Sequence, residues 1–392
     1  MKLIHPRQKY MKYNFDKIVD RRKTNSIKWG GKFNNELEMW IADMDIAVLP
    51  EIKNAILKKA EKDAYGYCYP TEEYFKSYIS WFKAHHGLII DKDWMIFSTG
   101  VVASIDTILK RVAKPGEEVV MFTPIYNVFF NCVRNNGLET LPCSLLYENG
   151  KYAIHWSKLE ELLQRSTVKV LLLCNPHNPC GVIFSKEDLI RLCELCYKND
   201  VLIISDEIHC DITDPKKEYV PILSCSTEDI IALVSPTKAF NLAGIQTSAI
   251  IIPDSVLKDT IERGIGADDN GDPNTFAVEA TIAAFKYGDE WNKQVREYIF
   301  KNKTYVKRFF SKEIPGLEVR GGDATYLMWV DISAYSKDSE EFVHKLQEET
   351  GLHLAAGSIY GSEGNTFVRI NVATSLENVK DCCRRLKAFL IK

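Results

Sequence analysis

The feature that most constrains the fold is a series of short apolar runs, each followed at once by a turn with polar side chains. Such runs occur at Val168–Cys174, at residues 201–204 and at Ile230–Val234. Each run is nearly all apolar and too short for a helix, which is typical of a buried strand of a largely parallel sheet. Open α/β sheets bind their ligands beyond the carboxyl ends of the strands. The polar residues after these runs are therefore candidates for a binding site.

The run Ile230–Val234 leads into Ser235, Pro236, Thr237 and Lys238. A lysine in an apolar setting loses its proton readily and can form a Schiff base. The flanking hydroxyls of Ser235 and Thr237 are able to bind an anion. Taken alone, this stretch favours the alternative, a surface lysine in a loop.

The other two runs end in an amide and a carboxylate. Val168–Cys174 is followed by Asn178 between two prolines, which gives a stiff turn and a fixed amide suited to a ligand oxygen. Residues 201–204 are followed by Ser205 and Asp206. A carboxylate at the end of a buried strand is costly unless a cation, such as a protonated ring nitrogen, pairs with it. A structural ion pair is the alternative for Asp206.

Two earlier turns add further candidates. Residues 94–97 lead to Gly100 and then a helical pattern, and free N–H groups at such a helix start bind phosphate. Residues 118–122 lead to Tyr126, which either stacks on a planar ring or belongs to the core.

The aromatic turn at residues 64–70 carries Tyr67. This side chain either packs against its neighbours or presents its hydroxyl to a phosphate in a neighbouring subunit. From Pro315 the chain reads as a second, α+β domain, with strands at residues 317–331 and 367–372 around a helix at Ser339–Thr350. Arg369 lies in the last strand, where it needs an anion: a substrate carboxylate, bound bidentately, or an internal Asp or Glu. Residues 264–273 are expected to form a polar loop at the rim of the site.

Composition narrows the class of protein. At 392 residues with 46% hydrophobic and 26% charged residues, the chain is globular and long enough for two domains. A net charge of −3 without a long basic run makes nucleic acid and anionic membranes poor partners. No apolar run approaches the ~18 residues that span a bilayer, and the start lacks the apolar core of a signal peptide. The eleven scattered cysteines then indicate reduced thiols of a cytoplasmic protein.

The order of these signals carries a family resemblance. This order resembles that of the fold-type I pyridoxal-phosphate enzymes of the aspartate aminotransferase superfamily. It consists of a glycine turn, an aromatic residue, Asn-Pro, an aspartate, a lysine about 32 residues later and a late arginine. Residues 40–45, 205–209, 235–244 and 322–329 resemble the cystathionine β-lyase (C–S lyase) branch that includes MalY, PatB and cystalysin. The resemblance implies an α/β fold: a large domain with a mostly parallel seven-stranded sheet flanked by helices, and a smaller α+β C-terminal domain. It also implies boundaries at 1–46 (an N-terminal segment packing with the small domain), 47–287 (the cofactor domain) and 288–392.

The same resemblance assigns roles. Lys238 would hold pyridoxal 5'-phosphate as a Schiff base and act as the catalytic base. Asp206 would contact the ring nitrogen, Asn178 the phenolic oxygen and Tyr126 the ring face. The phosphate would be held by Gly100, Val101, Val102, Ser235 or Thr237, and by Tyr67 of the other subunit of a homodimer with shared active sites. Arg369 would grip the α-carboxylate of an amino-acid substrate.

The implied reaction is elimination of a thiol from cystathionine or a related cysteine S-conjugate, giving pyruvate and ammonia. Gln246 stands where many aminotransferases of the superfamily carry a phosphate-binding arginine, which favours the lyase over the first alternative, an aminotransferase. A second alternative is a cofactor-binding regulator with little turnover. Departures from the branch pattern are expected to line the substrate pocket and leave substrate choice open; they fall at Asn127, Val128, Cys180, Asp323 and Ala324.

Overall fold

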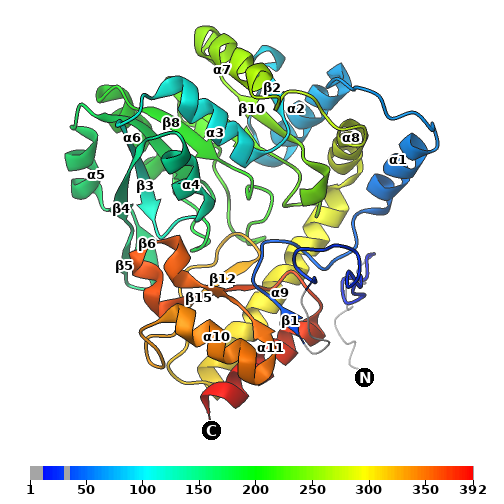
Figure 1. Ribbon diagram of the computed structural model, residues 1–392, viewed down its shortest axis with the longest axis vertical. Helices are drawn as coiled ribbons and strands as arrows, with labels where there is room; N and C mark the ends of the chain where they lie inside the picture. Colours follow the sequence, from blue (N-terminus) through cyan, green and yellow to red (C-terminus); the bar gives the residue numbers. More distant parts are fainter. Residues whose placement is uncertain (1–11, 31–35, 392) are drawn as a thin grey trace, which may run out of the picture.

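The computed structural model describes residues 12–30 and 36–391 and arranges them around two sheets (Figure 1). The larger sheet has seven strands in the order β2-β10-β9-β8-β7-β3-β4. Their bounds are β2 Met95–Ser98, β3 Glu118–Thr123, β4 Glu139–Ser144, β7 Val168–Cys174, β8 Leu202–Asp206, β9 Ile230–Val234 and β10 Ser248–Ile251. Only β10 runs against its neighbours; the remaining pairs are parallel. The mostly parallel seven-stranded sheet expected from the sequence is confirmed.

Helices cover both faces of this sheet, which explains why its central strands β7, β8 and β9 are almost entirely apolar. Along β9, Ile231 and Leu233 pack on one face, whereas Ile230, Ala232 and Val234 pack on the other. The first face is covered by α3 (Val101–Val112), α4 (Val128–Asn135) and α7 (Ser255–Ala267). The second is covered by α2 (Glu72–His86), α5 (Trp156–Leu163), α6 (Lys186–Lys198) and α8 (Ala277–Tyr287). Because side chains alternate between faces, burial on both sides requires an apolar residue at every position.

A smaller antiparallel sheet lies below the first in Figure 1, in the order β11-β12-β15-β14. Its strands are β11 Glu318–Val319, β12 Leu327–Asp331, β14 Ala355–Ala356 and β15 Phe367–Asn371, and its helices are α10 Ser339–Thr350 and α11 Leu376–Leu390. The long helix α9 (Asp289–Glu313) runs from the upper part to the lower. The single strand expected at residues 317–331 is wrong. Gly321 and Gly322, with φ of 72° and 99°, turn the chain between two shorter strands.

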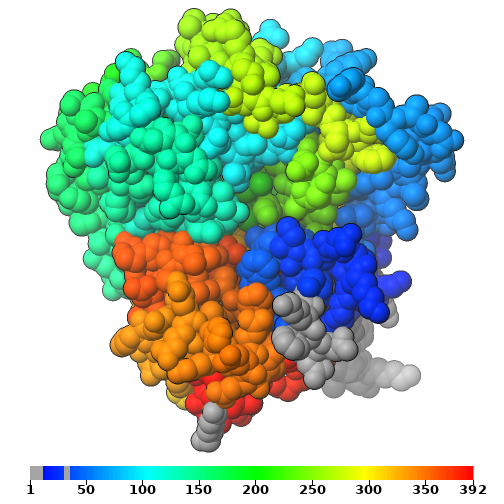
Figure 2. All heavy atoms as spheres, viewed as in Figure 1, coloured from blue at the N-terminus to red at the C-terminus, as the bar shows by residue number. Residues whose placement is uncertain are grey.

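The N-terminal segment lies against the C-terminal part of the chain. Strand β1 (Leu37–Glu38) pairs in parallel with β13 (Leu352–His353), and helix α1 (Pro50–Ala60) follows. Figure 2 shows the dark-blue N-terminal residues beside the orange C-terminal residues and below the green ones. The remaining elements are the hairpin β5 (Leu146–Glu148) and β6 (Lys151–Ala153) and the short 3-10 helices Lys92–Trp94, Ile222–Ser224, Ala243–Ile245, Gly357–Tyr360 and Ser362–Thr366. The domain boundaries at 46/47 and 287/288 stay predictions.

The polar loop expected at residues 264–273 is only partly present, because α7 continues to Ala267. Gly264 is buried there, and an added Cβ would lie 2.9 Å from the Arg111 side chain, so close helix packing explains this glycine. After the helix, the carbonyl of Asn270 accepts a 3.1 Å hydrogen bond from the N–H of Thr99. No helix among the described residues has the length and apolar character needed to cross a membrane.

Candidate active site

Lys238 lies just beyond the carboxyl end of β9, with its amine buried in the protein. Its Nζ donates a 2.8 Å hydrogen bond to the carbonyl of Ala42. Burial lowers the pKa of the amine to about 8, although the nearby Asp43 carboxylate opposes this shift. A lysine with that pKa has a substantial neutral fraction in mildly alkaline solution, so it can serve as a base or a nucleophile.

The two hydroxyls beside the lysine have different surroundings. Ser235 Oγ accepts from the Thr237 N–H at 3.1 Å and donates to the Thr247 carbonyl at 2.6 Å. Ser235 therefore stabilises the turn and does not line the adjacent cavity. Thr237 lines it and places its Oγ1 2.7 Å from Ser235 Oγ.

Asp206 lies at the carboxyl end of β8, almost fully buried. Its Oδ1 accepts a 3.0 Å hydrogen bond from the Ile208 N–H, and no ion pair to Asp206 occurs within the described part of the chain. Burial raises the pKa of this carboxyl to about 7. The next residue, Glu207, is the structural carboxylate of the pair, because Tyr219, Ser205 and the Ile222 N–H all donate to it. An internal ion pair therefore does not account for Asp206.

A cavity of about 760 Å³ brings most of the sequence-predicted residues together. They are Gly100, Val101, Val102, Tyr126, Asn178, Asp206, Thr237 and Lys238. No side chain caps the start of α3 at Gly100, so its first-turn N–H groups remain available to an anion. Gln246 and Asn270 are among the other residues that line this cavity.

Sequence reasoning missed His209, which also lines this cavity. Its Nδ1 is buried without a hydrogen-bond partner, and burial lowers the pKa of the imidazole well below its ordinary value. A neutral imidazole with an unpartnered Nδ1, in the same cavity as Asp206 and Lys238, implies a polar ligand. Its position three residues after Asp206, just beyond a strand end, was the available signal.

A second cavity, of about 990 Å³, meets the first at Ala42, Tyr126 and Lys238 and is also lined by Arg369. Arg369 donates from Nη1 to Asn178 Oδ1 at 3.1 Å and from Nη2 to the Trp40 carbonyl at 2.9 Å. Its Nε is buried without a partner, and within the described residues it forms no ion pair. The internal carboxylate considered as its alternative partner is not found there.

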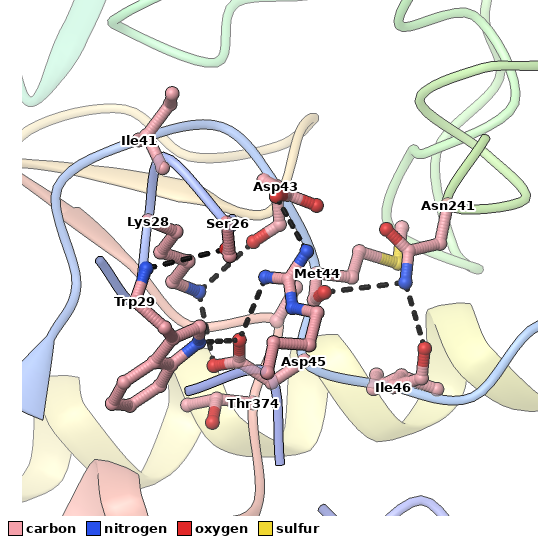
Figure 3. Close-up of polar contacts among 12 residues, drawn as sticks. Ser26, Lys28, Trp29, Ile41, Asp43, Met44, Asp45, Ile46, Asn241 and Thr374 are labelled. Atoms are coloured by element: carbon pink, nitrogen blue, oxygen red, sulfur yellow. Dashed lines mark hydrogen bonds and ion pairs between the residues drawn. The ribbon is translucent and has the colours of Figure 1, made fainter. Parts of the chain in front are cut away.

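Residues 40–46 form one wall of this second cavity, and side chains from two distant parts of the chain, the turn after β9 and the strand β15, hold their carbonyls. Besides Lys238 on Ala42, Asn371 Nδ2 donates to Ile41 and Asp43, at 2.7 and 2.8 Å. Figure 3 shows Asn241 reaching Met44 and Ile46, at 3.2 and 2.7 Å. The sequence identified residues 40–45 as a motif but not as a wall of the site, because carbonyl acceptors leave no pattern in side-chain identity.

The five residues at which this chain departs from the lyase-branch pattern, all expected to line the substrate pocket, fall into two groups. Asn127 and Val128 line the second cavity, whereas Cys180, Asp323 and Ala324 line neither. The prediction that Cys180 lines the pocket is wrong, because this side chain is fully buried among apolar side chains such as Trp329.

Tyr67 is fully exposed between the exposed Tyr65 and Tyr69, and it lines neither cavity. One copy of the chain does not bring its hydroxyl to the site.

The described residues include one group with metal-ligand spacing, His86, Cys210 and Asp211. Asp211 Oδ1 already accepts from Trp81 Nε1 at 2.8 Å and from His86 Nε2 at 2.7 Å. Burial also raises the pKa of the Cys210 thiol well above its ordinary value, which opposes the thiolate form that binds metals. The cluster is accounted for as a buried hydrogen-bond network.

Comparison with known proteins places this geometry in context. The family pattern described as aminotransferase class I and II matches residues 38–386. Over 385 residues, 96% of this chain and 100% of the relative, the sequence is 36% identical to cystathionine beta-lyase PatB of Bacillus subtilis (strain 168). The solved structure of cystalysin from Treponema denticola, which contains pyridoxal 5'-phosphate, has a TM-score of 0.93 at 30% identity and covers 96% of this chain and 98% of that one. The PLP-bound C-S lyase from Staphylococcus hominis has a TM-score of 0.92 at 31% identity, covering 97% and 98%.

Proposed function

Because the chain belongs to the class I and II aminotransferase family, we propose that it is a pyridoxal 5'-phosphate-dependent C–S β-lyase. Its substrates are cystathionine or related cysteine S-conjugates. With L-cystathionine and water, the products are homocysteine, pyruvate and ammonia. The similarity over the full length of the B. subtilis cystathionine beta-lyase supports this reaction over amino transfer.

The first cavity fits the cofactor. It offers what a planar, phosphorylated pyridine needs: free N–H groups at α3, the aromatic face of Tyr126, the buried carboxylate of Asp206 and the buried amine of Lys238. The unpartnered Nδ1 of His209 is a further sign that a polar group belongs there. We assign the phosphate to Gly100, Val101, Val102 and Thr237, with Ser235 holding the turn. Asp206 binds the ring nitrogen and Asn178 the phenolic oxygen.

When bound, the cofactor supplies an electron sink that stabilises negative charge at the substrate Cα. Arg369 binds the α-carboxylate through its guanidinium, whose buried Nε still lacks an acceptor. This contact would hold the substrate Cα within reach of Lys238, which lines both cavities. The neutral amine of Lys238 then takes the Cα proton as general base. The positive charge of a protonated ring nitrogen would favour the ionised form of Asp206, and this carboxylate would in turn hold the ring proton in place.

The observation that carries the proposal is a set of three buried groups: within the described chain Asp206 has no ion-pair partner, and Arg369 Nε and His209 Nδ1 have no hydrogen-bond partner. A buried carboxylate without a counterion and buried N–H or ring-nitrogen atoms without a hydrogen bond are costly, and all three groups lie around Lys238. One cofactor and one amino-acid substrate satisfy all of them together.

Pyruvate formation tests the proposal. Purified protein with pyridoxal 5'-phosphate and L-cystathionine should release pyruvate without any added 2-oxo acid, and Lys238→Ala should abolish both turnover and borohydride-trapped attachment of the cofactor. Pyruvate that appears only with an added 2-oxo acid would instead identify an aminotransferase. Gln246, which lines the cavity in the place where many aminotransferases have arginine, favours the lyase outcome.

Three further assignments belong to the same proposal. The chain acts as a homodimer in which the exposed Tyr67 reaches the phosphate of the other subunit's site. It is a cytoplasmic protein, in keeping with the eleven free cysteines. Residues 1–46, 47–287 and 288–392 act as the N-terminal segment, cofactor domain and small domain. Sedimentation analysis and a Tyr67→Phe variant with weakened cofactor affinity would test the dimer.

A further inference from the structure

The wall at residues 40–46 carries a cluster of four charged side chains, which the proposed chemistry does not use. Asp45 is buried and accepts from Lys28 Nζ at 2.9 Å and from Trp29 Nε1 at 2.7 Å (Figure 3). Arg21 bridges the two carboxylates, with Nη1 2.7 Å from Asp43 Oδ2 and Nη2 3.2 Å from Asp45 Oδ1. Two cations and two anions give the cluster a net charge of zero.

The cluster has a buried half and an accessible half. The side chains of Lys28 and Asp45 are 1% exposed, whereas those of Arg21 and Asp43 are each 22% exposed. The accessible pair lines the second cavity, which also contains Arg369 and Lys238. The buried pair and Trp29 therefore act as a rigid base that holds an ion pair on the cavity wall.

Both accessible groups keep unused hydrogen-bonding capacity. A guanidinium has five N–H donors, of which Arg21 uses two; its Nε is buried without a partner. Within the described residues, Asp43 Oδ1 accepts no hydrogen bond. An adjacent donor of positive charge and acceptor of negative charge are complementary to a carboxylate and an ammonium carried on one carbon, which is the head group of an α-amino acid.

We propose that Arg21 and Asp43 recognise the distal amino-acid head of the substrate, with the carboxylate on Arg21 and the ammonium on Asp43. This inference rests on the proposed function. It deepens that function by selecting, among cysteine S-conjugates, those whose sulfur substituent ends in a zwitterion. A cavity of about 990 Å³ with Arg369 for one carboxylate and Arg21 for another accommodates a substrate with two amino-acid heads.

Three substrates with the same cysteine half separate the contribution of the distal carboxylate from that of the distal ammonium. L-Cystathionine carries the distal zwitterion, S-(3-carboxypropyl)-L-cysteine carries only the distal carboxylate, and S-ethyl-L-cysteine carries no distal charge. Pyruvate release by the cofactor-loaded protein gives kcat and KM for each. The variants are Arg21→Met and Asp43→Asn. Arg22→Met is the matched control, because Arg22 is a neighbouring arginine that pairs with Asp20 and does not line this cavity.

Arg21→Met should raise KM for cystathionine and for the carboxypropyl substrate roughly tenfold or more, as expected for loss of a charge-assisted contact made before the chemical step. Asp43→Asn should raise KM for cystathionine only. Its side chain has nearly the same shape, so it tests charge without a fold defect. S-Ethyl-L-cysteine should keep its kcat/KM within about twofold in Arg21→Met, and the control should resemble the unmodified protein throughout.

Because Asp43 also acts on the Lys238 amine, its effect is judged from the ratio of cystathionine to S-ethyl-L-cysteine kcat/KM in the same variant. Equal losses on all three substrates would overturn the inference and leave Arg21 a structural residue. Pyruvate from none of the three with the unmodified protein would contradict the proposed function itself.

Discussion

Replacing Asp206 by asparagine should make the cofactor-free protein more stable at high pH while removing its function. Burial raises the pKa of Asp206 from an ordinary value of 3.8 to about 7. An acid with a raised folded-state pKa imposes no cost below pH 3.8, a growing cost between pH 3.8 and 7, and its full cost above pH 7. The substitution removes that cost, so its benefit must increase as the pH rises.

The size of the effect follows from the same two values. Their difference corresponds to roughly 4 kcal/mol at pH 8.5 and roughly 1.7 kcal/mol at pH 5. Asparagine also buries an N–H₂ group that finds no acceptor, at a cost of about 1–3 kcal/mol that does not depend on pH. The absolute gain is therefore smaller than about 4 kcal/mol, but its change between pH 5 and pH 8.5 should remain about 2–3 kcal/mol. Lys238 alters this little at pH 8.5, because burial lowers its pKa to about 8 and leaves the amine mostly neutral.

Urea unfolding of the cofactor-free protein and its Asp206→Asn variant, at one protein concentration and at several pH values, measures this difference. The cofactor-loaded variant should at the same time lose pyruvate release, because a neutral amide does not stabilise a protonated ring nitrogen. If the stability difference between the two proteins were the same at pH 5 and pH 8.5, burial would not be the dominant influence on this carboxyl, and the reasoning would be refuted.

Three other substitutions or titrations test separate parts of the structure. Asn371→Ala removes two hydrogen bonds to the wall and one accepted from the Ala373 N–H. The free energy of unfolding measured by urea titration should therefore fall by about 2–4 kcal/mol. A loss below about 0.5 kcal/mol would show that Asn371 is not needed to hold the wall. Gly181→Ala should lower stability by about 1–3 kcal/mol, because φ is +64° there and the new Cβ would lie 2.7 Å from the Ala324 carbonyl oxygen; an unchanged melting temperature would contradict this strain. The rate at which the cofactor-free protein attaches pyridoxal 5'-phosphate should rise with pH around a midpoint near 8, where Lys238 loses its proton, and a rise only towards pH 10 would contradict the effect of burial on this amine.

The parts of the site that the sequence predicts are those that local pattern and sheet geometry determine together. Asp206 and Lys238 each follow an apolar run, and the carboxyl ends of neighbouring parallel strands β8 and β9 necessarily meet at one edge. The start of α3 at Gly100 is equally local. For these residues, a strand assignment and the rules of parallel sheets are enough to predict which side chains become neighbours.

The remainder depends on contacts that local pattern does not encode. The wall at residues 40–46 is held through its carbonyls by Asn371 and Asn241, which are ordinary asparagines in the sequence. Arg21 resembles any other basic residue until the fold places it on the cavity beside Asp43. The helix end at Ala267 was missed because glycines in a polar segment indicate a loop, whereas here Gly264 permits close packing of α7.

The way the wall is held has a consequence for how the chain is made. Residues 40–46 are synthesised long before Arg369 and Asn371, which hold the carbonyls of Trp40, Ile41 and Asp43. At ordinary rates of translation the interval is on the order of tens of seconds. Once Lys238 has been added, the nascent chain carries this lysine for the rest of that interval while Arg369 and Asn371 cannot yet hold the wall that faces it. Capture of cofactor in a finished site is therefore deferred until Asn371 has been added. A chain that terminates between Lys238 and Arg369 carries the reactive lysine without the complete wall of its pocket.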